Sequence, residues 1–349
     1  EIEVRLVGSE MCIRDRFEYR YRILVCVTIL QALMNPIASL VLIRMNGGTA
    51  MMRILGIVGV QVCICVPIIV FQFCKGKEFF SKEYWGYALR IGIPIVPHYL
   101  SGIILNQGDR IMIDKMVGKT EVALYGLAYS IGMLVQLFIS GMNSALTPWM
   151  YSKIKKGDIR SMRKVLQLLS IVVVGIAVAL MLISPELVLI FGSPKYREAV
   201  YVIPPVAASV FFIFIYNILS MPQFYYEKTQ FLMAASMAAA GANVVLNFIF
   251  IRLFGYIAAG YTTLACYMLY SVGHYIVSKR ILVNEGIQEN LMNPGFLLAC
   301  SVFLIGASII CNLIFPYRIL RYAILLASAG LVFWKKELLL KTLADIRKK

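Results

Sequence analysis

Long apolar stretches separated by short polar links recur along almost the whole chain. A helix needs about 20 predominantly apolar residues to cross the hydrocarbon core of a bilayer. The stretches that reach or approach this length occupy residues 23–43, 54–74, 91–113, 123–149, 165–191, 199–221, 231–254, 257–277, 295–315 and 319–334. The links between them are shorter than about 20 residues, which leaves no room for a soluble domain. The pattern predicts an all-α fold, a polytopic transmembrane helix bundle of about ten spans.

Composition supports the membrane assignment. Hydrophobic residues make up 60% of the 349 residues and charged residues 15%, whereas soluble domains usually carry about 25% charged residues. The net charge of +16 would indicate nucleic-acid binding in a soluble protein. Here the basic residues lie in short links between apolar stretches, so we expect lipids around the chain and no nucleic acid.

The distribution of Lys and Arg predicts the topology. If the ends of the chain and every second link share one side of the membrane, that side holds 21 basic residues and the other holds 9. Basic residues concentrate on the cytoplasmic side of membrane proteins. We therefore expect both ends of the chain to be cytoplasmic.

The first residues differ from the rest. The stretch EIEVRLVGSEMCIRDR, residues 1–16, is polar and has no helical periodicity. It contains no apolar segment that could act as a signal peptide. Its second half resembles the translated read-through of a sequencing adapter, so we interpret residues 1–16 as a non-native leader.

The third predicted span contains two charged residues, which are unfavourable within a membrane helix. Asp109 and Arg110 lie within it, with Asn106 and Asp114 on the same helical face as Arg110, and His98 on the adjoining face. A charged side chain at the centre of a membrane helix costs about 2.5 to 3.5 kcal/mol. These residues either tie the helix to its neighbours or line a hydrated cavity that offers an anionic substrate a fixed cation. If the span ends earlier, Arg110 instead snorkels to the interface.

Two further spans have polar faces. In the fourth span, Tyr125, Tyr129, Gln136 and Asn143 recur at helical spacing on one face. Two asparagines of the seventh span, Asn243 and Asn247, also share a face. Close helix packing and cavity lining both explain such faces, and the sequence leaves the choice open. The histidine of the third span, His98, is either a structural group or a proton relay.

The motifs of several enzyme classes are missing. Gly118-Lys119-Thr120 has the end of a P-loop, but Ile113 stands where the first glycine is needed. The eight cysteines include no CxxC pair, and there is no HExxH or clustered histidine. We therefore expect neither an enzyme nor a metal centre nor a bound cofactor.

Several stretches in this order resemble the Wzx-type polysaccharide biosynthesis proteins, oligosaccharide flippases of the multidrug/oligosaccharidyl-lipid/polysaccharide exporter superfamily. They are WGYALRIGIPIVPHYLSGIILNQGDRIMIDKMVGKTEVALYGLAYS, NSALTPWMYSKIKKGD, SPELVLIFG, YVIPPVAAS, FYYEKT and ANVVLNFIFIRLFGYIAAGYTTLACYMLY. The resemblance implies a MATE-like architecture of two six-helix lobes. Residues 17–75 would then be the last two helices of an incomplete first lobe, as in an N-terminally truncated chain. Residues 76–90 would be a cytoplasmic linker, 91–280 the second lobe, and 281–349 two extra helices with a basic cytoplasmic tail.

The same resemblance implies a function. The chain would flip undecaprenyl-pyrophosphate-linked oligosaccharide repeat units from the inner to the outer leaflet of the bacterial inner membrane, for O-antigen, capsule or exopolysaccharide synthesis. Membrane lipids and the polysaccharide polymerase machinery would be its partners, and a gradient of H⁺ or Na⁺ its energy source. The alternative is a MATE-like drug or cation antiporter. The expected substrate cavity comprises Arg110, Asp109, Asn106, His98, Asp114, Tyr125, Tyr129, Gln136, Asn143, Asn243 and Asn247.

Overall fold

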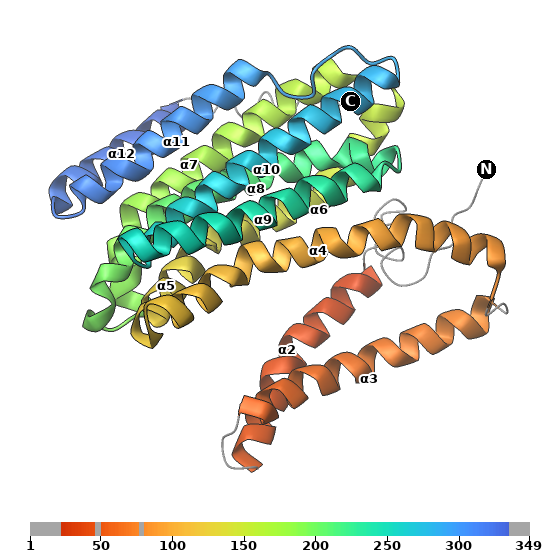
Figure 1. Cartoon of the computed structure of the whole chain (residues 1–349), viewed down its shortest axis with the longest axis horizontal. Coiled ribbons are helices and arrows are strands. Elements are labelled where there is room, and N and C mark those ends of the chain that lie inside the picture. The colour runs from red at the N-terminus through yellow and green to blue at the C-terminus, as the bar shows by residue number, and fades with distance from the viewer. Residues whose placement is uncertain (1–21, 46–49, 77–79, 335–349) are drawn as a thin grey trace. The chain divides into compact units, whose positions relative to one another are not determined.

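The computed structural model describes residues 22–45, 50–76 and 80–334, and within these residues the regular secondary structure is helical throughout (Figure 1). The expected leader, residues 1–16, and most of the expected basic tail, residues 335–349, lie outside the described residues. Long apolar segments without turn residues form helices because a helix satisfies every backbone polar group internally. The all-α class predicted from the apolar stretches is confirmed.

The helices follow the predicted spans closely. In chain order they are α2 (Arg22–Met45), α3 (Ala50–Gly76), α4 (Lys82–Met116), α5 (Lys119–Gly132), α6 (Leu134–Lys155), α7 (Ile159–Phe191), the 3₁₀ helix η1 (Pro194–Val202), α8 (Ile203–Tyr225), α9 (Thr229–Phe254), α10 (Ile257–Asn284), α11 (Pro294–Ile314) and α12 (Arg318–Trp334). Eight segments of the described residues are long and apolar enough to cross a membrane. The other two expected spans correspond to α10, whose inner face is polar, and α12, which has 17 residues.

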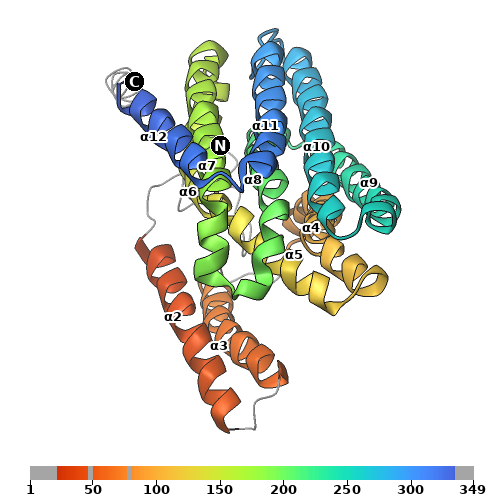
Figure 2. The ribbon, with the colours of Figure 1, turned by 90° about the vertical axis from the view of Figure 1, so that its left-hand side faces the viewer.

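The chain divides into two compact units, residues 1–92 and 93–349. In the first unit α2 and α3 lie side by side (Figure 2). Their closest approach is at Gly56, where a Cβ atom would lie 2.7 Å from the Cα of Ser39. The Ser39 hydroxyl donates to the carbonyl oxygen of Arg53 at 3.3 Å. Most of the large apolar side chains described on both helices are exposed, which suits contact with lipid.

The second unit is built around α8. Nearly all residues of α8 are buried, and the helix contacts α5, α6, α7, α10 and α11. Two aromatic side chains of α8, Phe211 and Phe214, are among the largest side chains that are fully buried. Figure 1 shows α7, α8, α9 and α10 running along one another. The site residues discussed below all belong to this unit.

The fourth expected span, 123–149, is divided into two helices. The helical dihedral angles are interrupted at Met133 (φ −83°, ψ 1°), which separates α5 from α6. At the preceding residue, Gly132, a Cβ atom would lie 2.6 Å from a methyl group of Val206 on α8. Only glycine fits so close an approach of two helices. The break therefore lies where the chain bends against the central helix.

Arg321, one of the basic residues that the topology count assigned to the non-cytoplasmic side, is buried, with a side chain that is 1% exposed. It donates to both carboxylate oxygens of Glu186 on α7, at 2.8 and 2.9 Å, and to the carbonyl oxygen of Leu182 at 2.7 Å. The carboxylate partner on α7 allows the guanidinium to be buried. An ion pair with two parallel hydrogen bonds thus joins α7 to α12.

We expect Arg321→Ala to destabilise the protein by about 2 kcal/mol, because it leaves the partly buried Glu186 carboxylate without its cation. The measurement is the midpoint of thermal unfolding of the purified protein in detergent. Arg318→Ala, at an exposed position of the same helix, should change the midpoint little. Equal midpoints for the two variants would contradict this role of the ion pair.

Candidate functional site

A fully buried carboxylate lies at the centre of the candidate site. Asp109 on α4 is 0% exposed and accepts three side-chain hydrogen bonds from three other helices. Tyr125 of α5 donates to it at 2.5 Å, Asn247 of α9 at 2.5 Å and Thr263 of α10 at 2.6 Å. None of the ion pairs among the described residues includes Asp109. Four helices therefore meet at the Asp109 carboxylate, which has hydrogen-bond donors but no cation beside it.

The two asparagines of α9 extend this group. Asn247 also donates to Asn243 Oδ1 at 3.1 Å, and the Thr262 hydroxyl donates to Asn247 Oδ1. Both asparagines are 0% exposed, and Asn243 Nδ2 has no partner within the described residues. An amide donor without a partner in a buried site indicates room for an oxygen atom or for a rearranged network. The asparagines that the sequence placed on one face do share a site with Asp109.

A second layer of hydrogen bonds adjoins the carboxylate along α4. Tyr129 and Tyr267 donate to Asn106 Oδ1 at 2.8 and 3.2 Å, from α5 and α10 respectively. The amide nitrogen of Asn106 donates to the Gly102 carbonyl oxygen at 2.8 Å. The tyrosine rings of Tyr125 and Tyr129 lie 5.7 Å apart, centroid to centroid. One face of α5 thus contacts two successive polar residues of α4.

Arg110 lies beside this group and remains partly exposed. Its NH1 donates to Gln107 Oε1 at 2.8 Å, and its guanidinium carbon lies 5.1 Å from the centroid of the Tyr129 ring. The Nε–H has no acceptor within the described residues. The guanidinium is therefore held against an aromatic face while part of its donor capacity stays unused.

Two histidines, His98 on α4 and His274 on α10, lie beside Tyr270. His98 Nδ1 is 3.0 Å from the Tyr270 hydroxyl, and His274 Nδ1 is 2.8 Å from Gln223 Nε2. The Tyr270 and His274 rings are also in contact, with centroids 4.5 Å apart. His98 has a hydrogen-bond partner here, which fits the structural interpretation of this residue.

Three expected site residues lie apart from Asp109. Asp114 on α4 is exposed, and Gln136 and Asn143 lie on α6, beyond the break at Met133. No hydrogen bond among the described residues joins them to the Asp109 group. Gln136 Oε1 is buried without a partner, and Asn143 accepts from Thr147 through its backbone carbonyl oxygen. The expected site therefore divides into a buried group around Asp109 and a separate polar face on α6.

The sequence analysis missed the contribution of α10. Thr262, Thr263 and Tyr267 contact Asp109 or its asparagine partners and are buried. Thr263, Tyr267, Tyr270, His274 and Ser278 recur at spacings of four, three, four and four, which is one face of a helix. This spacing identifies the polar face of α10, although it does not show which of its residues reach Asp109.

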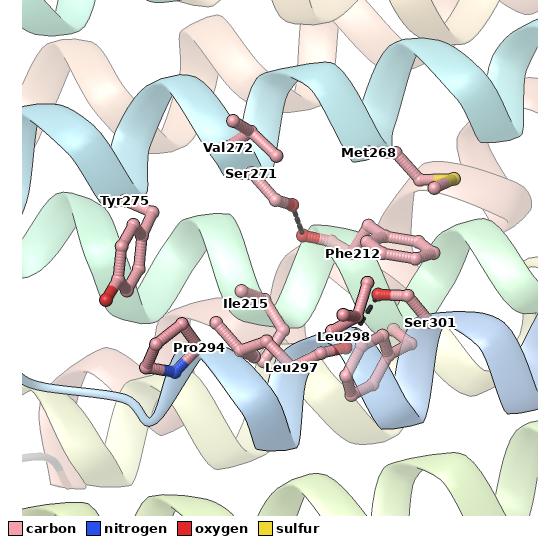
Figure 3. A pocket seen from close by; sticks show the side chains of 11 residues that line it. Phe212, Ile215, Met268, Ser271, Val272, Tyr275, Pro294, Leu297, Leu298 and Ser301 are labelled. Carbon is pink, nitrogen blue, oxygen red and sulfur yellow. Dashed lines mark hydrogen bonds between the residues drawn. The ribbon is translucent and has the colours of Figure 1, made fainter.

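An apolar pocket of about 260 Å³ lies elsewhere in the unit, between α8, α10 and α11 (Figure 3). Its lining includes Phe212, Ile215, Met268 and Leu298. The two serine hydroxyls in the lining donate to backbone carbonyl oxygens, Ser271 to Phe212 and Ser301 to Leu297. The other polar group in the lining is the hydroxyl of Tyr275. None of the lining residues belongs to the Asp109 group, so we do not assign the pocket to the polar site.

The chemistry of the site follows from its ligand atoms. Around Asp109 lie amide and hydroxyl oxygens, and the described residues contain no group of three or more His, Cys, Asp or Glu side chains that could hold a metal. A buried carboxylate with oxygen neighbours can be neutralised by a proton or by a hard monovalent cation. It lacks the second and third charged ligands that divalent ions usually have.

Two known families match parts of the chain. The family of polysaccharide biosynthesis proteins matches residues 15–155, and the MatE family matches residues 94–249. The overlap of the two matches contains Asp109, Arg110 and Tyr125. Over residues 15–249 the chain is thus similar to families of the multidrug/oligosaccharidyl-lipid/polysaccharide exporter superfamily, and both matches point to a membrane transporter.

Two individual relatives are similar to part of the chain. A protein of the Lsg locus of Haemophilus influenzae is 28% identical over 46% of this chain and 41% of its own length. An uncharacterized membrane protein of the same organism is 29% identical over 51% of this chain and 46% of its own length. The aligned region thus spans less than half the length of these relatives.

A solved structure shares the fold. A crystal structure of a MATE mutant superposes on 75% of this chain and on 62% of its own chain, with a TM-score of 0.54 and 16% identity. The expected MATE-like helical architecture is confirmed at the level of fold. The division into an incomplete first lobe and a complete second lobe stays a prediction.

We expect Asn247→Ala to destabilise the protein by about 2 kcal/mol, since it removes a donor to the buried carboxylate of Asp109. The thermal unfolding midpoint in detergent measures this. Asn143→Ala on α6 is the matched control, because it deletes the same amide from a half-buried position without a bond to a carboxylate. If both variants unfold at the same temperature, the Asp109 group does not contribute to the stability of this unit.

Proposed function

We propose that this protein flips an undecaprenyl-pyrophosphate-linked oligosaccharide from the inner to the outer leaflet of the bacterial inner membrane. The observation that carries the proposal is Arg110, a partly exposed residue within a membrane-spanning helix, whose Nε–H has no acceptor among the residues that the structure describes. The match to the polysaccharide biosynthesis family includes this residue and supports the choice of substrate.

The proposed mechanism follows from the cost of moving the head group. A pyrophosphate carries charges that cannot enter hydrocarbon alone, and Arg forms strong, directional hydrogen bonds with phosphate oxygens. In our proposal Arg110 binds the pyrophosphate, while Gln136 and Asn143 on α6 bind sugar hydroxyls. The polyprenyl chain stays in the bilayer. Alternating access then exposes the head group on one side of the membrane and afterwards on the other, with both chain ends in the cytoplasm and the polymerase machinery acting on the product.

The energy source in this proposal is a gradient of H⁺ or Na⁺ that acts at Asp109. A charge buried without a cation is unfavourable, so a proton or a small cation is attracted to it. The nearby oxygen atoms of Asn243, Thr262 and Thr263 suit either one. Binding of the ion on one side of the membrane and its release on the other would drive the cycle.

A second candidate function is a drug or cation antiporter. The match to the MatE family over residues 94–249 favours it, since that region contains Asp109 and two of its three hydrogen-bond donors, Tyr125 and Asn247. In such a protein the cavity would bind cations, and Arg110 would repel them. The charge of the cavity residue Arg110 therefore distinguishes the two functions.

We expect Arg110→Ala to abolish or strongly reduce flipping, because the pyrophosphate loses its cation. The measurement is surface polysaccharide in a bacterial strain that lacks its own flippase and expresses the gene that encodes this chain. Arg252→Ala is the control, since Arg252 is exposed on α9 and its guanidinium stacks on Phe248. Full polysaccharide with Arg110→Ala, or drug resistance as the phenotype that is lost, would overturn the flippase function.

We expect Asp109→Asn to remove ion coupling, because the amide cannot hold a proton or attract a cation. Protein reconstituted into vesicles is assayed for ²²Na⁺ uptake and, with a pH-sensitive dye, for proton uptake. Asp114→Asn serves as the control, because it makes the same change at an exposed position of the same helix. An unchanged ion flux in Asp109→Asn would exclude Asp109 as the coupling site.

A further inference from the structure

Two tyrosines of α5 connect the buried acid with the neighbouring base. Tyr125 donates to Asp109 at 2.5 Å, and one turn further along α5 the ring of Tyr129 lies under Arg110, 5.1 Å from its guanidinium carbon. The Tyr129 hydroxyl is fixed on Asn106 at 2.8 Å. The two rings lie 5.7 Å apart. The same short segment of α5 therefore contacts both functional groups of α4.

Asp109 and Arg110 do not pair with each other directly. Residues that are neighbours in a helix point about 100° apart, and the structure shows Asp109 among four helices while Arg110 remains partly exposed. Besides the backbone of α4 itself, α5 offers a path between them, because Tyr125 contacts Asp109 and Tyr129 contacts Arg110.

The position of α5 in the chain allows this helix to tilt when the charge of Asp109 changes. The helix has 14 residues and lies between the turn at Gly118 and the break at Met133. Its far end touches α8 closely at Gly132 and Val206. A short helix with a break at each end can tilt about such a contact without unfolding its neighbours.

We propose that Tyr125 and Tyr129 are positioning residues that make anion binding by Arg110 depend on the charge of Asp109. This rests on the proposed function, in which Arg110 binds the pyrophosphate. A charged Asp109 holds Tyr125 through a charge-assisted bond, which fixes α5 and keeps the Tyr129 ring under the guanidinium. Neutralisation of Asp109 weakens that bond, α5 loosens, and Arg110 loses its fixed position. The arrangement couples ion binding to release of the anion, as exchange of an ion for a substrate requires.

The sign of the effect distinguishes this relay from simple electrostatics. A negative charge on Asp109 repels an anion bound at Arg110. If direct Coulomb interaction were the only effect, removing that charge would tighten the binding of the anion. The relay predicts the opposite, because the loss of preorganisation at Arg110 weakens binding. A single affinity ratio therefore separates the two explanations.

The experiment measures binding of inorganic pyrophosphate to the full chain in lipid nanodiscs by isothermal titration calorimetry. Asp109→Asn and Tyr125→Phe should each weaken binding about fivefold or more. The double variant should be no weaker than either single variant, because both changes interrupt the same relay. Tyr322→Phe, which removes a tyrosine–carboxylate bond to Glu186 far along the chain, should leave the affinity unchanged.

Substitutions at Tyr129 test the aromatic support separately. Tyr129→Phe keeps the ring face under Arg110 and should retain most of the affinity, while Tyr129→Leu should weaken binding as strongly as Tyr125→Phe. This pair keeps the test decisive if Asp109→Asn folds poorly. Equal affinities for the Phe and Leu variants would overturn the role of the ring.

The outcomes separate the relay from the proposed function. The anion site stands if pyrophosphate binds and Arg110→Ala abolishes that binding. The relay is nevertheless wrong if Asp109→Asn tightens binding, or if the effects of Asp109→Asn and Tyr125→Phe add up in the double variant. If wild-type protein does not bind pyrophosphate, or binds it equally with Arg110→Ala, the anion site itself is wrong and the relay falls with it.

Discussion

The buried carboxylate of Asp109 is the constraint on which the second unit depends. A charge at bilayer depth costs several kcal/mol unless the protein supplies hydrogen bonds. Tyr125, Asn247 and Thr263 supply them from three helices, so α4, α5, α9 and α10 are positioned relative to one group. None of the ion pairs among the described residues places a cation next to this carboxylate.

Apolar contacts build the framework around that charge. The central helix α8 is buried almost along its whole length, and the apolar side chains of the peripheral helices face outward, where lipid replaces water as solvent. Where helices approach most closely, glycine is present, as at Gly132 against Val206. The interior is therefore apolar around α8 and polar along the seam formed by α4, α5, α9 and α10.

Much of this arrangement could be predicted from the sequence, for identifiable reasons. Apolar length alone predicts the spans, and a charge such as Asp109 inside a span is visible without any structure. The asparagines of α9 were found because amides are rare in apolar helices. Thr263 was missed because a threonine in a membrane helix often bonds only to its own backbone, so its presence does not indicate a site.

Other features depend on partners that are distant in sequence. The break at Met133 depends on the contact between Gly132 and Val206, which no local pattern reveals. Counting basic residues treats Arg321 only as a topology signal and cannot recognise its partner Glu186, which lies 135 residues earlier in the chain. The separation of Gln136 and Asn143 from Asp109 likewise follows from the bend between α5 and α6. Local patterns thus identify the polar groups, while tertiary contacts decide which of them meet.

The central claim is that the charge of Asp109 is exchangeable and does not serve only as a fixed link between helices. Infrared difference spectroscopy of the purified protein tests it most directly, with an Asp109→Asn sample to identify the carboxyl signal. The account predicts that changing the Na⁺ or proton concentration converts this signal between its charged and neutral or ion-bound forms. A carboxyl signal that stays constant across both titrations would contradict the account.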